Sequence, residues 1–239
     1  MSATLQTPLS PTATCQAEPS RRLARPRARN ATLARVAGGV AGPLFFTAGL
    51  IQATARDGFD FRRHTLSLLM NGDHGWIQVI NFMTTGLLFV VAAFGMRAVY
   101  RSSLGRTTLL LGIFGLSLVA AGVFRPDPAY GFPPGTAAGA PDSMSWHGAL
   151  HLAVAAVGFS ALVAACFTAA RHLTRCGERR WARQSRLVGA AFLVGFVSVG
   201  ANTVATNILF VVTAAAAFCW ASVVLATRPT ATGPAILRR

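Results

Sequence analysis

The sequence has no lysine, few acidic residues and few cysteines. Its 239 residues include 22 arginines, seven Asp or Glu residues and four cysteines, and only 12% of the residues are charged. Soluble domains carry about 25% charged residues because their surfaces face water. The shortage of charge therefore argues against a soluble enzyme. Four cysteines are too few for a disulfide-stapled secreted fold, and the few acids exclude an acidic disordered chain.

Long apolar runs are what the sequence has instead. Hydrophobic residues make up 53% of the chain, and a helix needs about 20 mostly apolar residues to cross a bilayer core. Runs of sufficient length cover residues 36–55, 77–100, 107–124, 146–170 and 187–227. The last run is long enough for two spans, which we expect to be joined by a turn within residues 201–207. The sequence therefore predicts six membrane spans.

The predicted fold class is an all-α, integral membrane six-helix transmembrane bundle. The apolar runs are continuous, whereas the strands of a membrane barrel alternate between apolar and polar residues. Every backbone N–H in lipid needs a partner, which a helix supplies within itself. We expect a six-span membrane domain over residues 36–227. A disordered basic tail is predicted for residues 1–35 and a short tail for residues 228–239.

The arginines predict the orientation of the bundle. Eighteen of them fall in residues 1–35, 97–106, 171–186 and 228–239, and the other four are Arg56, Arg62, Arg63 and Arg125. Basic residues near the ends of spans stay on the cytoplasmic side. Both termini are therefore predicted to be cytoplasmic, and the protein is expected in the cell (cytoplasmic) membrane.

Membrane lipids are the expected partners. The basic tail has no interleaved aromatic residues, so a nucleic-acid partner is not expected. Glycines recur along the first span at Gly38 and Gly42 and along the third at Gly112, Gly115 and Gly122. Small residues let helices approach closely in lipid. These faces are expected to serve either packing within the bundle or a homo-oligomer interface.

Most titratable groups other than arginine fall on the side predicted to face outward. This set contains Asp57, Asp60, Asp73, Asp127, Asp142, His64, His74, His147 and His151. Imidazoles and carboxylates are the groups that bind metals or transfer protons near neutral pH. The sequence therefore predicts a His/Asp cluster at the outer face.

Two of these histidines could bind a metal. His147 and His151 are four residues apart at the start of the fourth span, where Ser143 or Ser145 could serve as N-cap. This spacing places two imidazoles on one helix face and suits a zinc ion. The third ligand could come from His64, Asp73 or Asp127.

A zinc ion at this place would indicate a metal-dependent hydrolase that acts on a lipid-like substrate at the outer leaflet. Zinc lowers the pKa of bound water to about 7, which makes the water a nucleophile. Ser67 could orient that water, and Ser67 and Asp73 are the candidate catalytic residues.

Two alternatives stay open. The paired histidines could simply hydrogen-bond the outer loops and close the bundle, and no glutamate lies between them as in metalloproteases. The spans contain no charged residue at their centre, which argues against a proton-coupled pump or an ion channel. A small-molecule transporter remains a further possibility.

Three segments of the sequence resemble the signature of a known family. They are HTLSLLMNGDHGWIQVINF at residues 64–82, GVFRPDP at residues 122–128 and WHGALH at residues 146–151. Together they resemble the bacterial membrane family of domain of unknown function 998 (DUF998). The resemblance implies an uncharacterised six-span membrane protein over residues 35–227 and no settled activity. The family often has an acid directly after the second histidine of the third segment, where this chain has Leu152.

Overall fold

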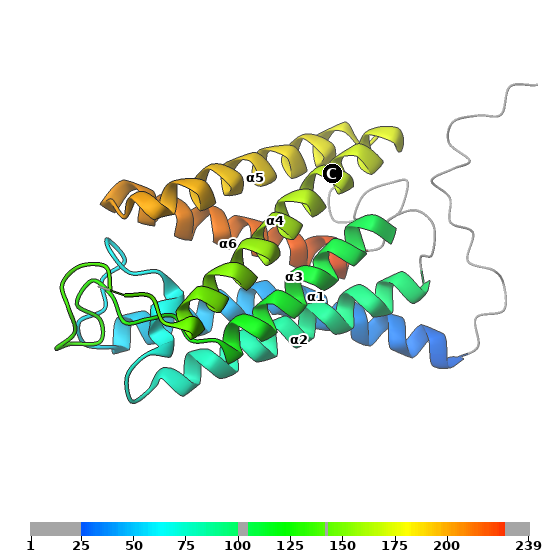
Figure 1. The fold of residues 1–239 in the computed structure, drawn as a ribbon. Helices are drawn as coiled ribbons and strands as arrows, with labels where there is room; N and C mark the ends of the chain where they lie inside the picture. The colour runs from blue at the N-terminus through cyan, green and yellow to red at the C-terminus, as the bar shows by residue number, and fades with distance from the viewer. Residues whose placement is uncertain (1–24, 100–104, 142, 228–239) are drawn as a thin grey trace, which may run out of the picture.

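The computed structural model describes residues 25–99, 105–141 and 143–227, and its elements are helices (Figure 1). The six long helices are α1 (Arg25–Ala55), α2 (Gly75–Val99), α3 (Gly105–Val123), α4 (Trp146–Arg175), α5 (Arg179–Ser198) and α6 (Val204–Ala226). Two short 3-10 helices are η2 (Leu66–Met70) and η3 (Val199–Ala201). All six long helices have the length and hydropathy needed to cross a membrane. The predicted all-α, six-span bundle is confirmed.

The helices form a closed ring. Each helix packs against its neighbours in chain order, and α6 returns to α1. Arg35 Nε donates a hydrogen bond of 2.9 Å to the Ala226 carbonyl, which joins the start of α1 to the end of α6. The two long connections, residues 56–74 and 124–145, lie together at the opposite end (Figure 1). We call that end the loop end and the other the arginine end.

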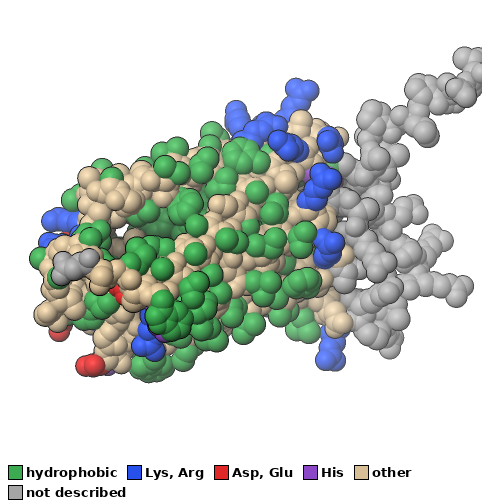
Figure 2. Space-filling view, in the orientation of Figure 1, with side chains coloured by type: hydrophobic (Ala, Val, Ile, Leu, Met, Phe, Trp, Pro, Cys, Tyr) green, Lys and Arg blue, Asp and Glu red, His purple; other side chains and the backbone are tan. Residues whose placement is uncertain are grey.

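Charge separates along the bundle. In Figure 2, most arginines lie at the arginine end, hydrophobic side chains cover much of the middle of the visible face, and the acidic side chains lie at the loop end together with a few arginines. Charged groups are costly in hydrocarbon and favourable in the headgroup region. The distribution is that of a multi-pass membrane protein surrounded by lipid.

Glycines bring α1, α2, α3 and α6 into close contact. A Cβ atom on Gly86 would lie 2.5 Å from the Gly115 carbonyl oxygen, and one on Gly115 would lie 2.8 Å from the Gly86 carbonyl oxygen. The Gly42 N–H donates a 2.8 Å hydrogen bond to Ser222 Oγ on α6. Gly38 of α1 likewise faces Leu225 of α6. These small-residue faces are therefore used within the chain.

Two predicted boundaries differ from the structure. The first helix begins at Arg25, so residues 25–35 are helical rather than part of a disordered tail, and α5 begins at Arg179 rather than at residue 187. Arginine is a good helix former. The basic residues therefore mark where the apolar span ends but not where the helix ends. Residues 1–24 and 228–239 of the two predicted tails lie outside the described residues.

The predicted turn between the last two spans is shorter than expected. Asn202 takes a left-handed conformation (φ 44°), and Thr203 caps α6 by accepting from the Thr206 N–H. Residues 204–207, which were predicted to be part of the turn, are therefore already helical.

The axes of α4 and α5 spread apart toward the loop end. The helices α4 and α5 meet at the arginine end, where residues 176–178 join them, and they diverge toward the loop end (Figure 1). Only 22% of the apolar window of α5 is buried, against 56% for α3. The contact of α3 with its neighbours is therefore extensive, whereas α4 and α5 are joined toward the loop end by phenylalanine side chains such as Phe159 and Phe196.

Candidate functional site

His64 links the two long loops. Its Nδ1 accepts a 2.8 Å hydrogen bond from the Asp60 N–H, so the proton is on Nε2, which donates to the Tyr130 carbonyl at 3.0 Å. The ring is 1% exposed and lies against Phe59 and Phe132. Both ring nitrogens are already bonded within the protein, which leaves no lone pair for a metal ion.

Burial changes the acidity of His64. Removal of the ring from water lowers its pKa below the usual 6.5, and the nearby Arg63 acts in the same direction. The Tyr130 hydrogen bond and the Asp60 carboxylate oppose this shift. His64 is therefore held as a neutral structural link at neutral pH.

Arg56 fixes the same loops from the end of α1. Its guanidinium donates to the carbonyl oxygens of Leu69 (3.3 Å) and Asn71 (2.6 Å) at the end of η2. It also lies 5.3 Å from the centre of the Phe132 ring, which is fully buried. The loop end is therefore an ordered cap on the bundle, and η2 forms its buried floor.

Asp127 has a structural role at the start of α4. One carboxylate oxygen accepts a 2.9 Å hydrogen bond from the Ser145 N–H, and Ser145 Oγ accepts from the Gly148 N–H at 3.0 Å. The sequence predicted Ser143 or Ser145 as the N-cap of the fourth span. The structure shows that Ser145 is the N-cap of α4. A Cβ atom on Gly148 would collide with the Asp127 carboxylate. A carboxylate at this position stabilises the positive end of the helix dipole.

The structure separates the predicted zinc ligands. His147 is exposed, and its ring stacks on Trp146 with centres 3.6 Å apart. His151, one turn later, is buried on the bundle side of α4, and Asp73 is exposed in the first loop. Across residues 25–99, 105–141 and 143–227, no three His, Cys, Asp or Glu side chains are grouped so that they could hold a metal ion.

His151 is held by the end of α3. Its Nδ1 lies 3.1 Å from the Ala121 carbonyl oxygen and 2.7 Å from that of Phe124. Because carbonyls only accept, this nitrogen carries the proton. The last carbonyls of a helix have no partner within it, and His151 satisfies two of them. Nothing in the part of the chain that the structure describes hydrogen-bonds to the other nitrogen, Nε2.

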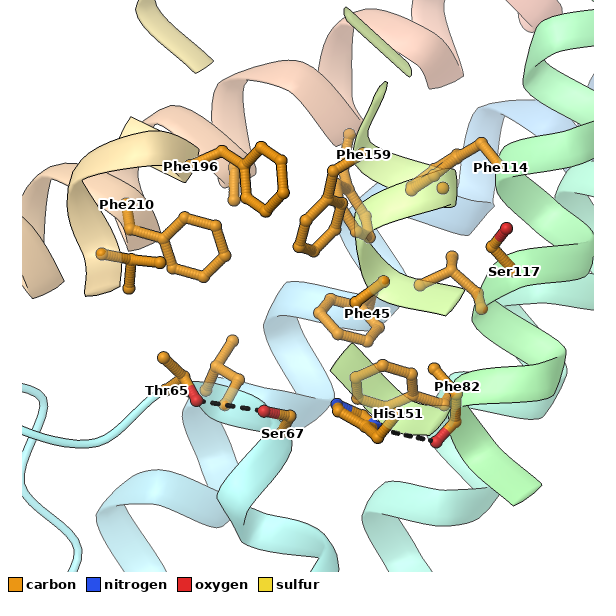
Figure 3. Close-up of a pocket in the computed structure, with 18 of the residues that line it drawn as sticks. Phe45, Thr65, Ser67, Phe82, Phe114, Ser117, His151, Phe159, Phe196 and Phe210 are labelled. Atoms are coloured by element: carbon orange, nitrogen blue, oxygen red, sulfur yellow. Dashed lines mark hydrogen bonds between the residues drawn. The ribbon is translucent and has the colours of Figure 1, made fainter. Parts of the chain in front are cut away.

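His151 lines a cavity of about 160 Å³ inside the ring of helices (Figure 3). Eight phenylalanines contribute to its wall: Phe45, Phe46, Phe82, Phe114, Phe159, Phe196, Phe210 and Phe218. The lining includes no acidic residue and no arginine. The polar side chains are those of Thr65, Ser67, Ser117 and His151. The cavity is therefore an apolar chamber with a few polar groups.

Thr65, Ser67 and His151 lie toward one end of the chamber, and Ser117 lies apart from them (Figure 3). Figure 3 shows His151 between Ser67 and Phe82, with one ring nitrogen on the side of Ser67 and the other bonded to a carbonyl. Ser67 Oγ and Thr65 Oγ1 lie 3.0 Å apart and share a hydrogen bond. The predicted catalytic candidate Ser67 thus lies in the same cavity as His151, whereas Asp73, His147, Asp127 and His64 are not part of its lining.

A network of amides supports this end of the chamber from behind. Gln78 is fully buried, accepts from Gln52 Nε2 (2.7 Å) and Asn81 Nδ2 (3.1 Å), and donates to the Leu66 carbonyl (3.1 Å). Its bonds connect α1, α2 and η2. They fix the position of η2, which carries Ser67.

The phenylalanines of the chamber were not recognised from the sequence. They come from α1, α2, α3, α4, α5 and α6, and all but Phe196 of α5 sit in spans that are apolar on most sides. Such spans carry no amphipathic signal that shows which face is internal. The high number of phenylalanines within the spans was the signal available.

A comparison with family models identifies the family of this chain. The model of the family described as "Protein of unknown function (DUF998)" matches residues 39–228. The chain belongs to the DUF998 family. The match includes every residue of the chamber wall, so the chamber is part of the DUF998 domain. No curated protein and no solved structure matches the chain.

Proposed function

We propose that this DUF998 protein binds the apolar chain of a lipid-like molecule in the phenylalanine-lined chamber. The observation that carries the proposal is a partly open cavity whose wall is almost wholly apolar and which lies among membrane-spanning helices. Binding sites for small molecules are concave and mostly apolar, with a few polar groups that fix orientation. Hydrocarbon chains are the most abundant molecules around such a site.

The chamber wall formed by α4 and α5 supports a lateral entrance from the membrane, because Leu152 lines the chamber and is also exposed. Both helices contribute to the chamber wall, with Leu152, Ala155 and Phe159 from α4 and Phe196 from α5. They diverge toward the loop end, and Leu152 is 55% exposed on the outer surface. A chain that enters between them would pass from lipid into the chamber without crossing water.

The proposal includes an orientation in which the loop end faces outward from the cytoplasmic membrane. Arginines are concentrated at the other end of the bundle (Figure 2). Basic residues that flank spans are retained on the cytoplasmic side. The chamber and its polar groups would then lie toward the outer leaflet.

A pair of neighbouring substitutions tests the proposed binding. Ala155 lines the chamber, and Ala156 is exposed on the outside of the same helix. We expect Ala155→Trp to fill the cavity and to abolish saturable labelling by a photoactivatable long-chain alkane in detergent-purified protein. Ala156→Trp should label as the wild type does. Equal labelling of the two variants would contradict the proposal.

Cysteine labelling tests the orientation separately. Gly139 and Glu178 lie in connections at opposite ends of the bundle. In intact cells, a maleimide that does not cross membranes should modify the Gly139→Cys variant and not the Glu178→Cys variant. The reverse pattern would place the loop end inside.

A further inference from the structure

The tautomer of His151 restricts what the polar end of a ligand can be. Nδ1 carries the proton because it bonds to the carbonyls of Ala121 and Phe124. In a neutral imidazole the other nitrogen is then an acceptor. The two nitrogens of the ring point in widely different directions, so Nε2 faces away from α3 and toward the chamber (Figure 3).

The ring is kept neutral by its surroundings. No carboxylate lines the chamber to pair with an imidazolium, and an unpaired charge in an apolar site is costly. The chamber therefore offers a hydrogen-bond acceptor at His151 and no positive charge.

The hydroxyl pair next to His151 offers the complementary group. Ser67 and Thr65 have one hydroxyl hydrogen each, and their mutual bond uses one of the two. The second hydrogen is available to a ligand oxygen. This end of the chamber thus has an acceptor at His151 Nε2 and a donor at the hydroxyl pair.

We infer, on the basis of the proposed lipid binding, that the ligand carries a hydroxyl group that donates to His151 Nε2 and accepts from the Ser67–Thr65 pair. The chemical class is a neutral lipid alcohol, such as a long-chain alcohol, an isoprenoid alcohol or an acylglycerol. An ether or ester oxygen has no hydrogen to donate to Nε2. A carboxylate would place its negative charge against the lone pair of Nε2, with no cation in the chamber wall.

The test compares ligands that share one alkyl chain and differ at the end. The readout is competition with the photoactivatable alkane on purified wild-type protein at neutral pH. The alcohol should compete about tenfold more tightly than its methyl ether, since one hydrogen bond separates them. The fatty acid should compete more weakly than the alcohol.

Variants of Ser67 and His151 test whether the difference in affinity between the ligands arises at this end of the chamber. Ser67→Ala should weaken the alcohol and the ether to a similar extent, because both oxygens accept from the hydroxyl pair, and His151→Phe should bring the alcohol and the ether to equal affinity while labelling by the alkane persists. His147→Phe is the matched control one turn away, outside the chamber, and should keep the full preference. The ligand comparison on wild-type protein and Ser67→Ala stands even if His151→Phe does not fold.

The results separate the two proposals. If alcohol and ether bind the wild type equally well, or if the fatty acid binds most tightly, the hydroxyl inference is overturned while chain binding stands. If none of these ligands competes and the alkane does not label the chamber, both proposals are overturned. A preference for the alcohol over the ether that survives His151→Phe, or alcohol binding that Ser67→Ala leaves unchanged, would also overturn the inference.

Discussion

The two sides of the bundle are held together in different ways. Where α2 meets α3, the backbones touch through Gly86 and Gly115, and amide side chains join α1 to α2. Where α4 faces α5 near the loop end, phenylalanines stand between the helices. Lipid gives helices no hydrophobic reason to associate, so small residues and polar links must bring them together. Between α4 and α5 at the loop end, phenylalanines take the place of small residues and polar links. This part of the bundle leaves room for a ligand.

The two buried histidines repeat this contrast at the scale of one side chain. Both nitrogens of His64 are bonded within the cap, whereas His151 uses only one, and the other faces the chamber. A histidine that uses both nitrogens is a structural link. One that keeps a nitrogen free in a cavity can bind a ligand.

The largest expected loss of stability comes from a substitution where α2 contacts α3. Gly115→Val would place side-chain atoms against the Gly86 carbonyl and Phe89. Overpacking of this kind costs about 1–3 kcal/mol of stability, which reversible unfolding in detergent micelles can measure. Gly200→Val is the control because nothing lies within 4 Å of a Cβ atom there. Equal losses for both variants would show that α2 and α3 are not in close contact.

Loss of the amide network should have a somewhat smaller effect. Gln78→Leu removes three hydrogen bonds, of which one joins α2 to α1, one joins α2 to η2 and one lies within α2. Bonds of this type are worth well under 1 kcal/mol each in membrane helices, so about 1–2 kcal/mol of stability should be lost. The exposed Gln184 on α5 provides the control Gln184→Leu, which should be neutral. A neutral Gln78→Leu would argue against the network.

Acid should weaken the cap through His64. Because burial lowers the pKa of His64 in the folded protein, the unfolded chain binds more protons in the range below pH 6.5. Stability is therefore complete above about pH 6.5 and declines as the pH falls toward the folded pKa. A scan of the unfolding temperature against pH should show this decline in wild type and less of it in His64→Phe. If the exposed His74→Phe flattens the curve and His64→Phe does not, His64 is not the group that titrates.

The smallest expected loss of stability comes from Asp127, and a second aspartate near the loop end, Asp73, serves as its control. Asp127→Ala removes the carboxylate that accepts from the Ser145 N–H at the start of α4, which should cost about 0.5–1 kcal/mol. Asp73 is exposed, and Asp73→Ala should leave the unfolding free energy unchanged. An equal cost at Asp73 would contradict the role given to Asp127 in α4 capping.

The sequence allowed the spans to be predicted because their signal is local. Each apolar run is long enough by itself, and Ser145 could be recognised as a possible cap from its position before Trp146. The start of α5 at Arg179 was missed because hydropathy follows the membrane boundary rather than the helix. DUF998 membership was recognisable from the three short segments.

The arrangement of the histidines depended on information that is not local. Spacing placed His147 and His151 on one face, but it could not show that α3 carbonyls bond to His151 while His147 stacks on Trp146. The partners of His64 include Tyr130, which lies in the other loop. Helix rotation and loop packing decide these contacts, and neither can be inferred from hydropathy.

The most direct test of chain binding in the chamber is to map where the photoactivatable alkane attaches. Peptide sequencing by mass spectrometry of the labelled wild-type protein would give the modified residues. We predict attachment at chamber-lining positions of α4, α5 and α6, such as Phe159, Phe196 and Phe210, and loss of that attachment in Ala155→Trp. Attachment confined to outward-facing residues such as Val157 and Val197 would contradict the account.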